Sequence, residues 1–264
     1  MGKTVSFPEK IDKHSLKRIK KIHARKMKEE LHIKKHALPI ERIKTGIQGF
    51  DALVEGGIPK NSLMLVTGGP GTGKTTFGVE YLVQGALKGE RGVYVSLEED
   101  SEKIENTLEQ FGWPVKNLEK ENKLFILKPN LVDFSKLKEL VEDTVTNFGA
   151  KRLVIDSISL LKLYFRSSYT VRKTLLDLEK KLKEMDCTTI MVSETPKEMD
   201  SLSPFGVEEF IADGIVLLNM VETKGEFKRS LAIRKMRLTN HSLKIHPIKI
   251  KKQGGIEIGA KKAL

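Results

Sequence analysis

The chain has 264 residues, of which 39% are hydrophobic and 31% are charged, a balance typical of one soluble α/β domain with an appendage rather than of a disordered protein. No apolar run approaches the roughly 20 residues of a membrane-spanning helix, so the sequence predicts no membrane partner. A single cysteine, Cys187, excludes an internal disulfide, and the N-terminus lacks the apolar core of a secretory signal. We therefore expect a cytoplasmic protein.

The net charge of +12 is concentrated at the two ends of the chain. Residues 1–40 hold 12 Lys and Arg against 4 Asp and Glu, and residues 244–264 hold 6 against 1. Within residues 9–36, a spacing of three and four predicts a basic amphipathic helix carrying Leu16, Ile19, His23, Met27 and Leu31. Pro39 closes this segment, so we expect a basic N-terminal helical arm over residues 1–38 and one domain over residues 39–264. The arm is a candidate nucleic-acid contact, and a solvated tail is the alternative.

The domain alternates short apolar runs with amphipathic stretches of helical length. Strands are predicted at residues 63–67, 92–97, 124–127, 152–156, 188–193 and 214–221, and helices at residues 74–88, 101–111, 135–148 and 170–185. This order predicts an α/β fold with a mostly parallel, twisted sheet flanked by helices. After residue 221, alternating runs at residues 231–233, 243–245, 248–250 and 256–258 predict an antiparallel C-terminal edge.

A phosphate-binding loop lies between the first predicted strand and helix. The residues Gly68-Gly69-Pro70-Gly71-Thr72-Gly73-Lys74-Thr75 match the P-loop pattern, and Thr76 continues into the helix. Glycines let the backbone N–H groups face the phosphates, aided by the positive end of the helix. We expect Lys74 to reach the β- and γ-phosphates of ATP and the Thr75 hydroxyl to bind Mg²⁺.

Two further predicted strands end in carboxylates. Asp156 follows an apolar run, as expected of the acid that holds Mg²⁺ beside a P-loop, although a helix-capping role is the alternative. Glu98 and Glu99 follow another strand and are candidates to orient or deprotonate the attacking water, against a solvated acidic turn. The next two residues, Asp100 and Ser101, are expected to cap the following helix.

Together these motifs resemble the KaiC family of RecA-like ATPases, which includes the cyanobacterial clock ATPase and single-domain archaeal relatives. The resemblance covers about residues 38–258. Besides the P-loop, the matching motifs are Ile47-Gln48-Gly49-Phe50-Asp51, Gly56-Gly57-Ile58-Pro59, Leu97-Glu98-Glu99, Phe111-Gly112-Trp113, Val154-Ile155-Asp156-Ser157 and Phe205-Gly206-Val207-Glu208-Glu209-Phe210 with Asp213.

The resemblance implies a RecA-like P-loop NTPase fold and a homo-oligomer, commonly a hexameric ring, with ATP held between subunits. It also implies that the paired glutamates act on the attacking water. A strand carrying Lys235 and Arg237, followed by His241, would face the phosphates of the neighbour's nucleotide. The residues alone place two cations on one face of a strand, where solvent exposure is the alternative to an arginine finger.

One departure from the family concerns self-phosphorylation. The autokinase half of the clock protein has adjacent Ser and Thr before an Ile-Thr-Asp stretch, whereas this chain has Glu209 and Phe210 before Ile211-Ala212-Asp213. The resemblance is therefore to the hydrolytic half, and neither autokinase activity nor a circadian role follows from the fold.

We interpret the sequence as a Mg²⁺-dependent ATPase that regulates an unidentified protein partner. A DNA recombination or repair ATPase is one alternative, because Tyr164, Phe165, Arg166 and Tyr169 could stack bases, although residues 197–210 carry one Lys and four acids that would repel phosphate. A slow nucleotide-gated switch is another. His32 and His36 have a zinc-ligand spacing without a third ligand. Trp113 and Cys187 are expected to be buried packing residues.

Overall fold

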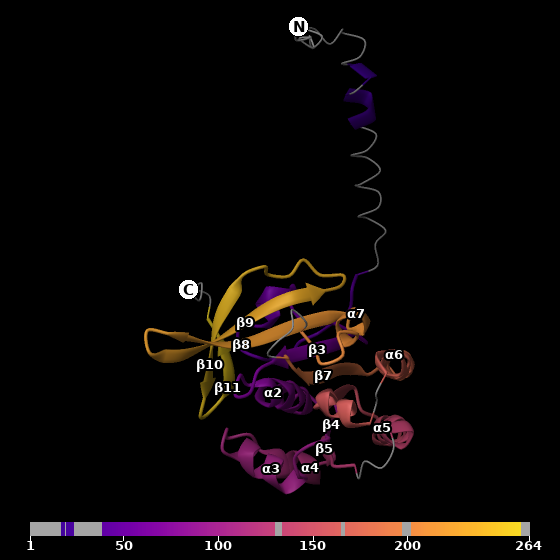
Figure 1. Ribbon diagram of the computed structural model, residues 1–264, viewed down its shortest axis with the longest axis vertical. Helices are drawn as coiled ribbons and strands as arrows, with labels where there is room; N and C mark the ends of the chain where they lie inside the picture. The colour runs from indigo at the N-terminus through magenta and orange to yellow at the C-terminus, as the bar shows by residue number, and fades with distance from the viewer. Residues whose placement is uncertain are drawn as a thin grey trace. The chain divides into compact units, whose positions relative to one another are not determined.

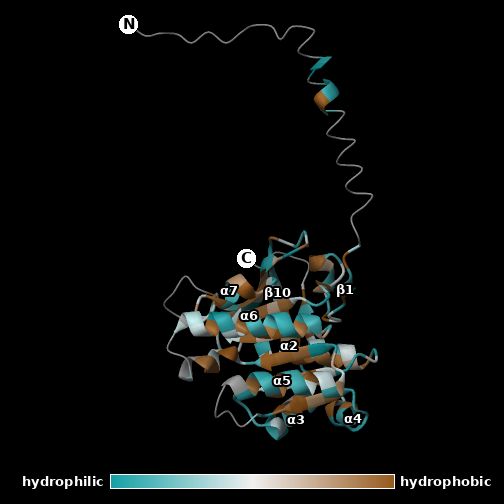
Figure 2. Cartoon of the chain, turned by 90° about the vertical axis from the view of Figure 1, so that its right-hand side faces the viewer, coloured by the Kyte–Doolittle hydropathy of each residue, from teal (hydrophilic) through white to brown (hydrophobic). Residues whose placement is uncertain are grey.

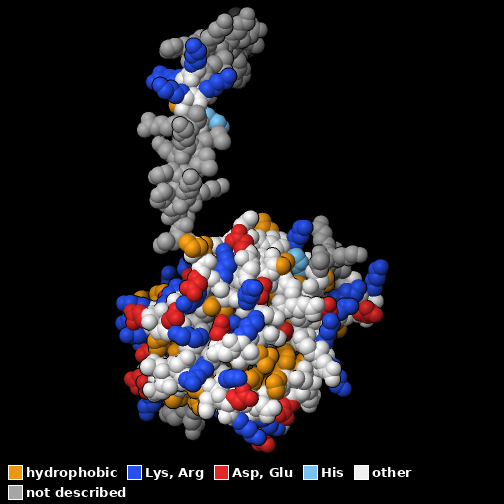
Figure 3. Space-filling view, turned by 180° about the vertical axis from the view of Figure 1, so that it is seen from behind, with side chains coloured by type: hydrophobic (Ala, Val, Ile, Leu, Met, Phe, Trp, Pro, Cys, Tyr) orange, Lys and Arg blue, Asp and Glu red, His pale blue; other side chains and the backbone are white. Residues whose placement is uncertain are grey.

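The computed structural model describes residues 17–18, 20–23, 39–129, 134–164, 167–196 and 202–259. The chain forms two compact units, Met1–Ile40 and Glu41–Leu264. In the first unit, residues 17–18 and 20–23 are helical and exposed, while the other positions of the predicted arm helix, with His32 and His36, lie outside the described residues. Seen from behind in Figure 3, the side chains described in this unit are mainly cationic, whereas the second unit intersperses Lys and Arg with Asp and Glu.

In the described part of the second unit, nine strands form one mixed sheet in the order β11-β10-β9-β8-β3-β7-β6-β4-β5 (Figure 1). The strands that pair in parallel are β3 (Leu63–Gly68), β4 (Gly92–Ser96), β5 (Leu124–Leu127), β6 (Arg152–Asp156), β7 (Thr188–Glu194) and β8 (Gly214–Thr223). The antiparallel edge consists of β9 (Glu226–Met236), β10 (Ile245–Lys251) and β11 (Gly255–Ile258). The predicted architecture is thus confirmed.

The antiparallel edge differs from the prediction in one respect. Residues 243 and 244 belong to no strand, and β10 begins only at Ile245, so the predicted strand at residues 243–245 is wrong. The alternation of apolar and polar residues at positions 243–245 does not mark a strand here, because Leu243 is not a core residue and is 88% exposed. A separate small ladder joins β1 (Arg42–Ile43) to β2 (Ile58–Pro59).

Helices cover both faces of the sheet. They are α2 (Lys74–Ala86), α3 (Ser101–Glu109), α4 (Val115–Lys120), α5 (Phe134–Phe148), α6 (Ser168–Glu184) and α7 (Glu208–Ile211), with 3₁₀ turns η1 (Asp51–Val54) and η2 (Ile158–Leu163). Figure 2 shows hydrophilic residues along the outward faces of α5 and α6. Helix α4 has no counterpart among the predicted elements, since its six residues are too few to show a helical period.

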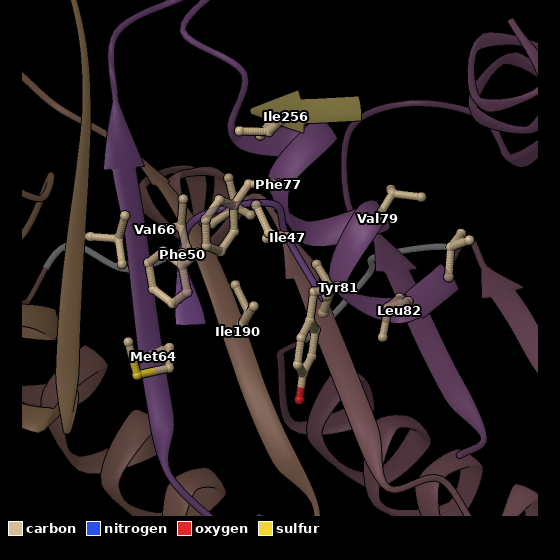
Figure 4. Close-up of a cluster of buried hydrophobic side chains, with 14 of the residues drawn as sticks. Ile47, Phe50, Met64, Val66, Phe77, Val79, Tyr81, Leu82, Ile190 and Ile256 are labelled. Atoms are coloured by element: carbon tan, nitrogen blue, oxygen red, sulfur yellow. The ribbon is translucent and has the colours of Figure 1, made fainter. Parts of the chain in front are cut away.

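The core consists of two apolar clusters, one on each face of the sheet. Strand β3 shows how the sequence builds both, because Met64 and Val66 point into the cluster around α2 while Leu63 and Leu65 point into the cluster around α5 and α6. Figure 4 shows the first cluster, where side chains of α2 such as Phe77 meet those of β3 and β11. A buried parallel strand therefore reads as a continuous apolar run.

One residue in this core is a buried arginine. Arg152, at the start of β6, is 1% exposed, and its guanidinium donates to Glu90 Oε2 (2.6 Å), to Tyr81 O (2.7 Å) and to Lys44 O (3.0 Å). It also lies 4.6 Å from the centre of the Tyr81 ring. Arg152 thus ties the C-terminal half of α2 to the sheet and to the segment that leads into the domain.

Replacing Arg152 with Met should therefore destabilise the domain. We expect the free energy of unfolding to fall by about 2 to 3 kcal/mol, somewhat less than for a fully buried ion pair, because Glu90 is 35% exposed and can be hydrated. Urea unfolding measures the effect. The matched control is Arg91→Met at an exposed neighbouring position, where a change of about 0.5 kcal/mol or less is expected. Equal losses in the two variants would contradict the proposed role of Arg152.

Candidate nucleotide site

The predicted P-loop connects β3 to α2. Gly71 and Gly73 adopt positive φ angles of 71° and 103°, which glycine accepts without strain. A Cβ atom at Gly73 would lie 2.7 Å from Ile250 Cδ1, the end of a side chain that can move aside, so it is the backbone conformation that requires glycine there. The loop thus bends back over the first turn of α2, with its helix N-terminus at Lys74.

Lys74 lies across the loop that precedes it. Its Nζ donates to Gly69 O at 2.9 Å, and the Thr72 hydroxyl donates to the same carbonyl at 2.8 Å. Burial lowers the pKa of Lys74, and the nearby carboxylates of Glu194, Asp156 and Glu98 oppose that shift. The half-buried ammonium is therefore the cation around which the acidic groups of the site gather.

Thr75 and Asp156 meet directly. The Thr75 hydroxyl donates to Asp156 Oδ2 at 2.7 Å, and the Tyr94 hydroxyl donates to the same oxygen at 2.7 Å. Burial raises the pKa of Asp156, while these two hydrogen bonds lower it. Tyr94 was not predicted, although its place in the strand before Glu98 could have signalled it. The adjacent hydroxyl and carboxylate oxygens are hard donors of the kind that Mg²⁺ prefers.

The structure separates the two adjacent glutamates. Partial desolvation beside Asp156 and Glu194 raises the pKa of Glu98, and a hydrogen bond with Ser157 and the charge of Lys74 oppose the shift. Glu99 instead forms an ion pair with Lys103 one helical turn along α3, at 2.9 Å. Of the two candidates, Glu98 is the one whose charge acts on Lys74, whereas the charge of Glu99 acts on Asp156 and Tyr94.

A third carboxylate, Glu194, was missed by the sequence analysis. It ends β7, the strand between β3 and β6, and its charge acts on both Lys74 and Glu98. Its backbone N–H donates to the Ser159 hydroxyl at 2.8 Å. The signal was available, because a carboxylate directly after an apolar strand is the same pattern that identified Asp156.

A cavity of about 470 Å³ opens beside the loop. The P-loop supplies one side, and Phe111, Arg229 and Ile250 supply the other. Arg229 Nε donates to Gly71 O at 2.8 Å, and the Phe111 ring stacks on Trp113 with a centroid distance of 5.1 Å. Trp113 is buried, as predicted. No local motif marks Arg229 or Ile250, since both are ordinary members of antiparallel strands.

Lys235 and Arg237 lie away from the P-loop of their own chain. Arg237 pairs with Asp213 (2.9 Å), whose backbone N–H donates to Leu63 O at the start of β3. The P-loop follows the other end of β3 at Gly68, roughly 17 Å away at about 3.3 Å per residue. Lys235 Nζ donates to Glu209 O (3.0 Å), and His241 Nδ1 is 3.1 Å from Ser242 O.

A second cavity, of about 610 Å³, surrounds Arg237 rather than the P-loop. It is lined by Pro59, Lys60, Asn61, Ser62, Lys183, Asp213, Arg237 and Leu238. Its cations are already paired within the chain, as Lys183 bonds Asp213 at 3.0 Å and Lys60 bonds Asp186 at 3.2 Å. The lining of this cavity, at the end of β3 opposite the P-loop, thus carries three cations, of which Lys183 and Arg237 share Asp213.

Other features of the sequence contribute little to the site. Over the ranges that the structure describes, no group of three or more His, Cys, Asp or Glu side chains could hold a metal by itself. Burial raises the pKa of the Cys187 thiol to about 12, as for an unreactive core residue. Tyr164 and Tyr169 are exposed, whereas residues 165–166 and 197–201 lie outside the described ranges. None of the described helices is long and apolar enough to span a membrane.

The chain resembles proteins of known family in both sequence and structure. A family model described as the KaiC ATPase matches residues 43–263. A UPF0273 protein of Thermotoga maritima is 37% identical over 81% of this chain and 95% of its own length. The circadian clock oscillator protein KaiC of Prochlorococcus marinus is 34% identical over 81% of this chain, which matches 44% of that longer protein.

A solved structure agrees with this assignment. The crystal structure of a KaiC-like protein from the hyperthermophilic archaeon Pyrococcus horikoshii superposes with a TM-score of 0.76 and 42% identity, covering 84% of this chain and all of that one. This likeness confirms the predicted RecA-like α/β fold. On the family model, the relatives and the fold, the chain belongs to the KaiC family of ATPases.

Proposed function

We propose that the protein binds ATP with Mg²⁺ and hydrolyses it in a homo-oligomer, with each nucleotide shared between two subunits. The main support for this proposal is that Lys74, the Thr75–Asp156 pair and Glu98 lie close together at one edge of the sheet. Phosphoryl transfer needs a cation on the phosphates, oxygen ligands for the metal and a group on the attacking water, and these residues supply all three.

Each residue has a separate task in this mechanism. The backbone of residues 69–73 and Lys74 hold the phosphates, and Lys74 exchanges its bond to Gly69 O for phosphate oxygens. Thr75 and Asp156 would hold Mg²⁺, which neutralises charge on the phosphates when bound. Glu98 orients the attacking water and accepts its proton, and its raised pKa strengthens it as a base. Glu99 supports the turn through Lys103.

The remaining wall of the cavity fits the nucleoside part of ATP. Phe111 and Ile250 offer apolar contact to the nucleoside. The guanidinium of Arg229 donates one N–H to Gly71 O and has further N–H groups that can donate to the ligand. A pocket that combines apolar side chains with placed polar groups is typical of small-ligand sites. Self-phosphorylation is not part of the proposal, since Glu209 and Phe210 carry no hydroxyl.

Sharing of the nucleotide rests on where Arg237 lies. Because Arg237 sits at the start of β3 and the P-loop at its end, Arg237 serves a neighbour's nucleotide more readily than its own. Lys235 and His241 belong to the same edge. Asp213 holds the Arg237 guanidinium at 2.9 Å, which preorganises it for transition-state charge. We propose a hexameric ring, regulation of a protein partner as its output, and nucleic-acid contact through the basic arm.

Replacing Lys74 with Ala should weaken ATP binding by about 100-fold, because charge-assisted hydrogen bonds to two phosphates are lost. Isothermal titration calorimetry at fixed Mg²⁺ measures the affinity. Lys88→Ala, at an exposed position just beyond the other end of α2, is the matched control and should bind like the wild type. Unchanged affinity in Lys74→Ala would refute the assignment of the loop.

Glu98→Gln should lower ATP turnover by roughly 100-fold or more while sparing ATP binding, because the amide cannot accept a proton. Glu99→Gln at the adjacent position is the matched variant and should lose less than about fivefold. In the wild type, turnover should fall as acid protonates Glu98, at a pH above the ordinary glutamate range because the pKa is raised. A larger loss in Glu99→Gln would transfer the role to Glu99.

Arg237→Ala should lower turnover by at least about 100-fold and leave nucleotide binding intact, since the lost interaction forms with charge that develops during transfer. Mixing it with Lys74→Ala supplies the decisive measurement. In random rings about one quarter of the interfaces would join an intact P-loop to an intact Arg237, so activity should reappear. Full activity of Arg237→Ala as a verified monomer would exclude the shared site.

A further inference from the structure

Helix α2 carries a carboxyl group that the mechanism does not use. Glu80 lies five residues after Thr75 and is 1% exposed, within the apolar cluster that α2 shares with β11 and Trp113. Its Oε2 accepts a hydrogen bond of 2.7 Å from the backbone N–H of Ile256. A buried carboxyl in an apolar core is costly when ionised, so its single polar contact has a large effect on the local structure.

The hydrogen bond between Glu80 and Ile256 is linked through Ile250 to the 470 Å³ cavity beside the P-loop, which we call the nucleotide cavity. Ile256 is paired with Ile250 in the β10–β11 ladder, and Ile250 lines the cavity against Gly73. By bonding the Ile256 N–H, Glu80 fastens the β10–β11 hairpin to the helix that follows the P-loop. Figure 4 shows Ile256 beside Phe77 near the start of this helix. The wall formed by Ile250 is thus held from behind by Glu80.

Glu80 also borders the second apolar wall of the cavity. At Gly255, with φ of 77°, a side chain would collide with the Glu80 carboxyl and with the Trp113 ring, whose Cζ2 lies 2.6 Å from the place of the absent Cβ. Trp113 in turn stacks on Phe111, which lines the cavity. The Glu80 carboxyl group therefore bonds the support of Ile250 and lies beside Gly255 together with Trp113, the support of Phe111.

Several charged groups on the elements packed around Glu80 pair with other residues, and the buried His246 on β10 has its Nε2 2.8 Å from the Ser242 hydroxyl. On the hairpin Lys251 pairs with Glu257 at 2.8 Å, and beside Trp113 Lys116 pairs with Glu109 at 3.0 Å. On β6 the guanidinium of Arg152 bonds Glu90. Burial raises the pKa of Glu80 to about 7, and the Ile256 N–H opposes the shift. Among the residues that the structure describes, none forms an ion pair with Glu80 that would offset the cost of its charge.

We propose that Glu80 is a positioning residue whose protonation closes the β10–β11 hairpin and Trp113 onto the nucleotide cavity and whose ionisation loosens them. The proposal rests on the proposed nucleotide site. It makes ATP binding responsive to pH through a group that never touches the nucleotide.

The direction of the effect follows from linkage. In the closed state the pKa is about 7, and in an opened, hydrated state it returns toward 4.5, so the closed state binds the proton more tightly. Closure is therefore fully favoured in acid. Between about pH 4.5 and 7 the ratio of closed to open protein falls by up to about tenfold per pH unit, and above 7 it levels off because both states are ionised.

Fluorescence of Trp113 tests the ionisation without nucleotide, because the chain has a single tryptophan. We expect one transition near pH 7 in the wild type and none in Glu80→Gln, which keeps an acceptor for the Ile256 N–H but does not titrate. Glu257→Gln on the same hairpin is the matched control and should retain the transition. A transition that persists in Glu80→Gln, or is absent from the wild type, would overturn the proposal.

Binding of a fluorescent ADP analogue with Mg²⁺ between pH 6 and 8.5 tests the coupling. Dividing the wild-type affinity by the Glu80→Gln affinity at each pH removes the effect of the ligand's own titration. We expect this ratio to fall by about fivefold or more between pH 6 and 8.5. A constant ratio would overturn the coupling. If the wild type fails to bind at pH 6, the proposed nucleotide site is wrong, whereas the fluorescence transition still decides the ionisation of Glu80.

Hydrogen exchange in the wild type alone provides a test that needs no variant. After correction for the intrinsic rate, protection of the Ile256 amide should decrease as the pH rises from about 5 to 7 and level off above that, while protection of Val66 in the central strand should not change. Equal pH dependence at the two amides would contradict the loosening of the hairpin.

Discussion

The parallel pairing of β3, β7, β6 and β4 is the constraint on which the candidate site depends. Parallel strands end at the same edge of a sheet, so the P-loop after β3, Glu194 at the end of β7, Asp156 at the end of β6 and Glu98 after β4 are brought together although they are far apart in sequence. The geometry is rigid because these strands are buried on both faces. The negative charges of these groups then surround Lys74.

The antiparallel strands contribute residues to the cavity beside the P-loop and to the opposite edge of the sheet. Strands β9 and β10 bring Arg229 and Ile250 to the side of the P-loop, and β9 leads to Arg237 at the opposite edge. Strand β9 therefore runs past one nucleotide cavity and ends near the surface proposed to meet another. In a ring, a single strand would link two neighbouring sites, with Asp213 fixing its end to the start of β3.

The sequence was sufficient for the parts of the site that depend on local patterns. A strand, a glycine-rich loop and a helix identify the P-loop, and a carboxylate after an apolar run identifies Asp156. Adjacent residues such as Glu98 and Glu99 cannot be told apart in this way, because the direction of each side chain depends on the turn that follows the strand. Arg229 and Ile250 escaped notice since their role arises only from pairing between distant strands. Buried Glu80 was missed because nothing local distinguishes it from a solvated glutamate on a helix.

The two halves of the nucleotide cavity are encoded in separate stretches of the gene. In the proposed site, phosphate contacts come from residues 68–76, whereas Phe111, Arg229 and Ile250, which would face the nucleoside, lie in other parts of the sequence. A single substitution at Phe111, which does not take part in the proposed reaction, would therefore alter the nucleoside side without changing a residue of the P-loop. This independence would let related chains diverge in nucleotide preference and in ligand affinity while the chemistry of the loop stays the same.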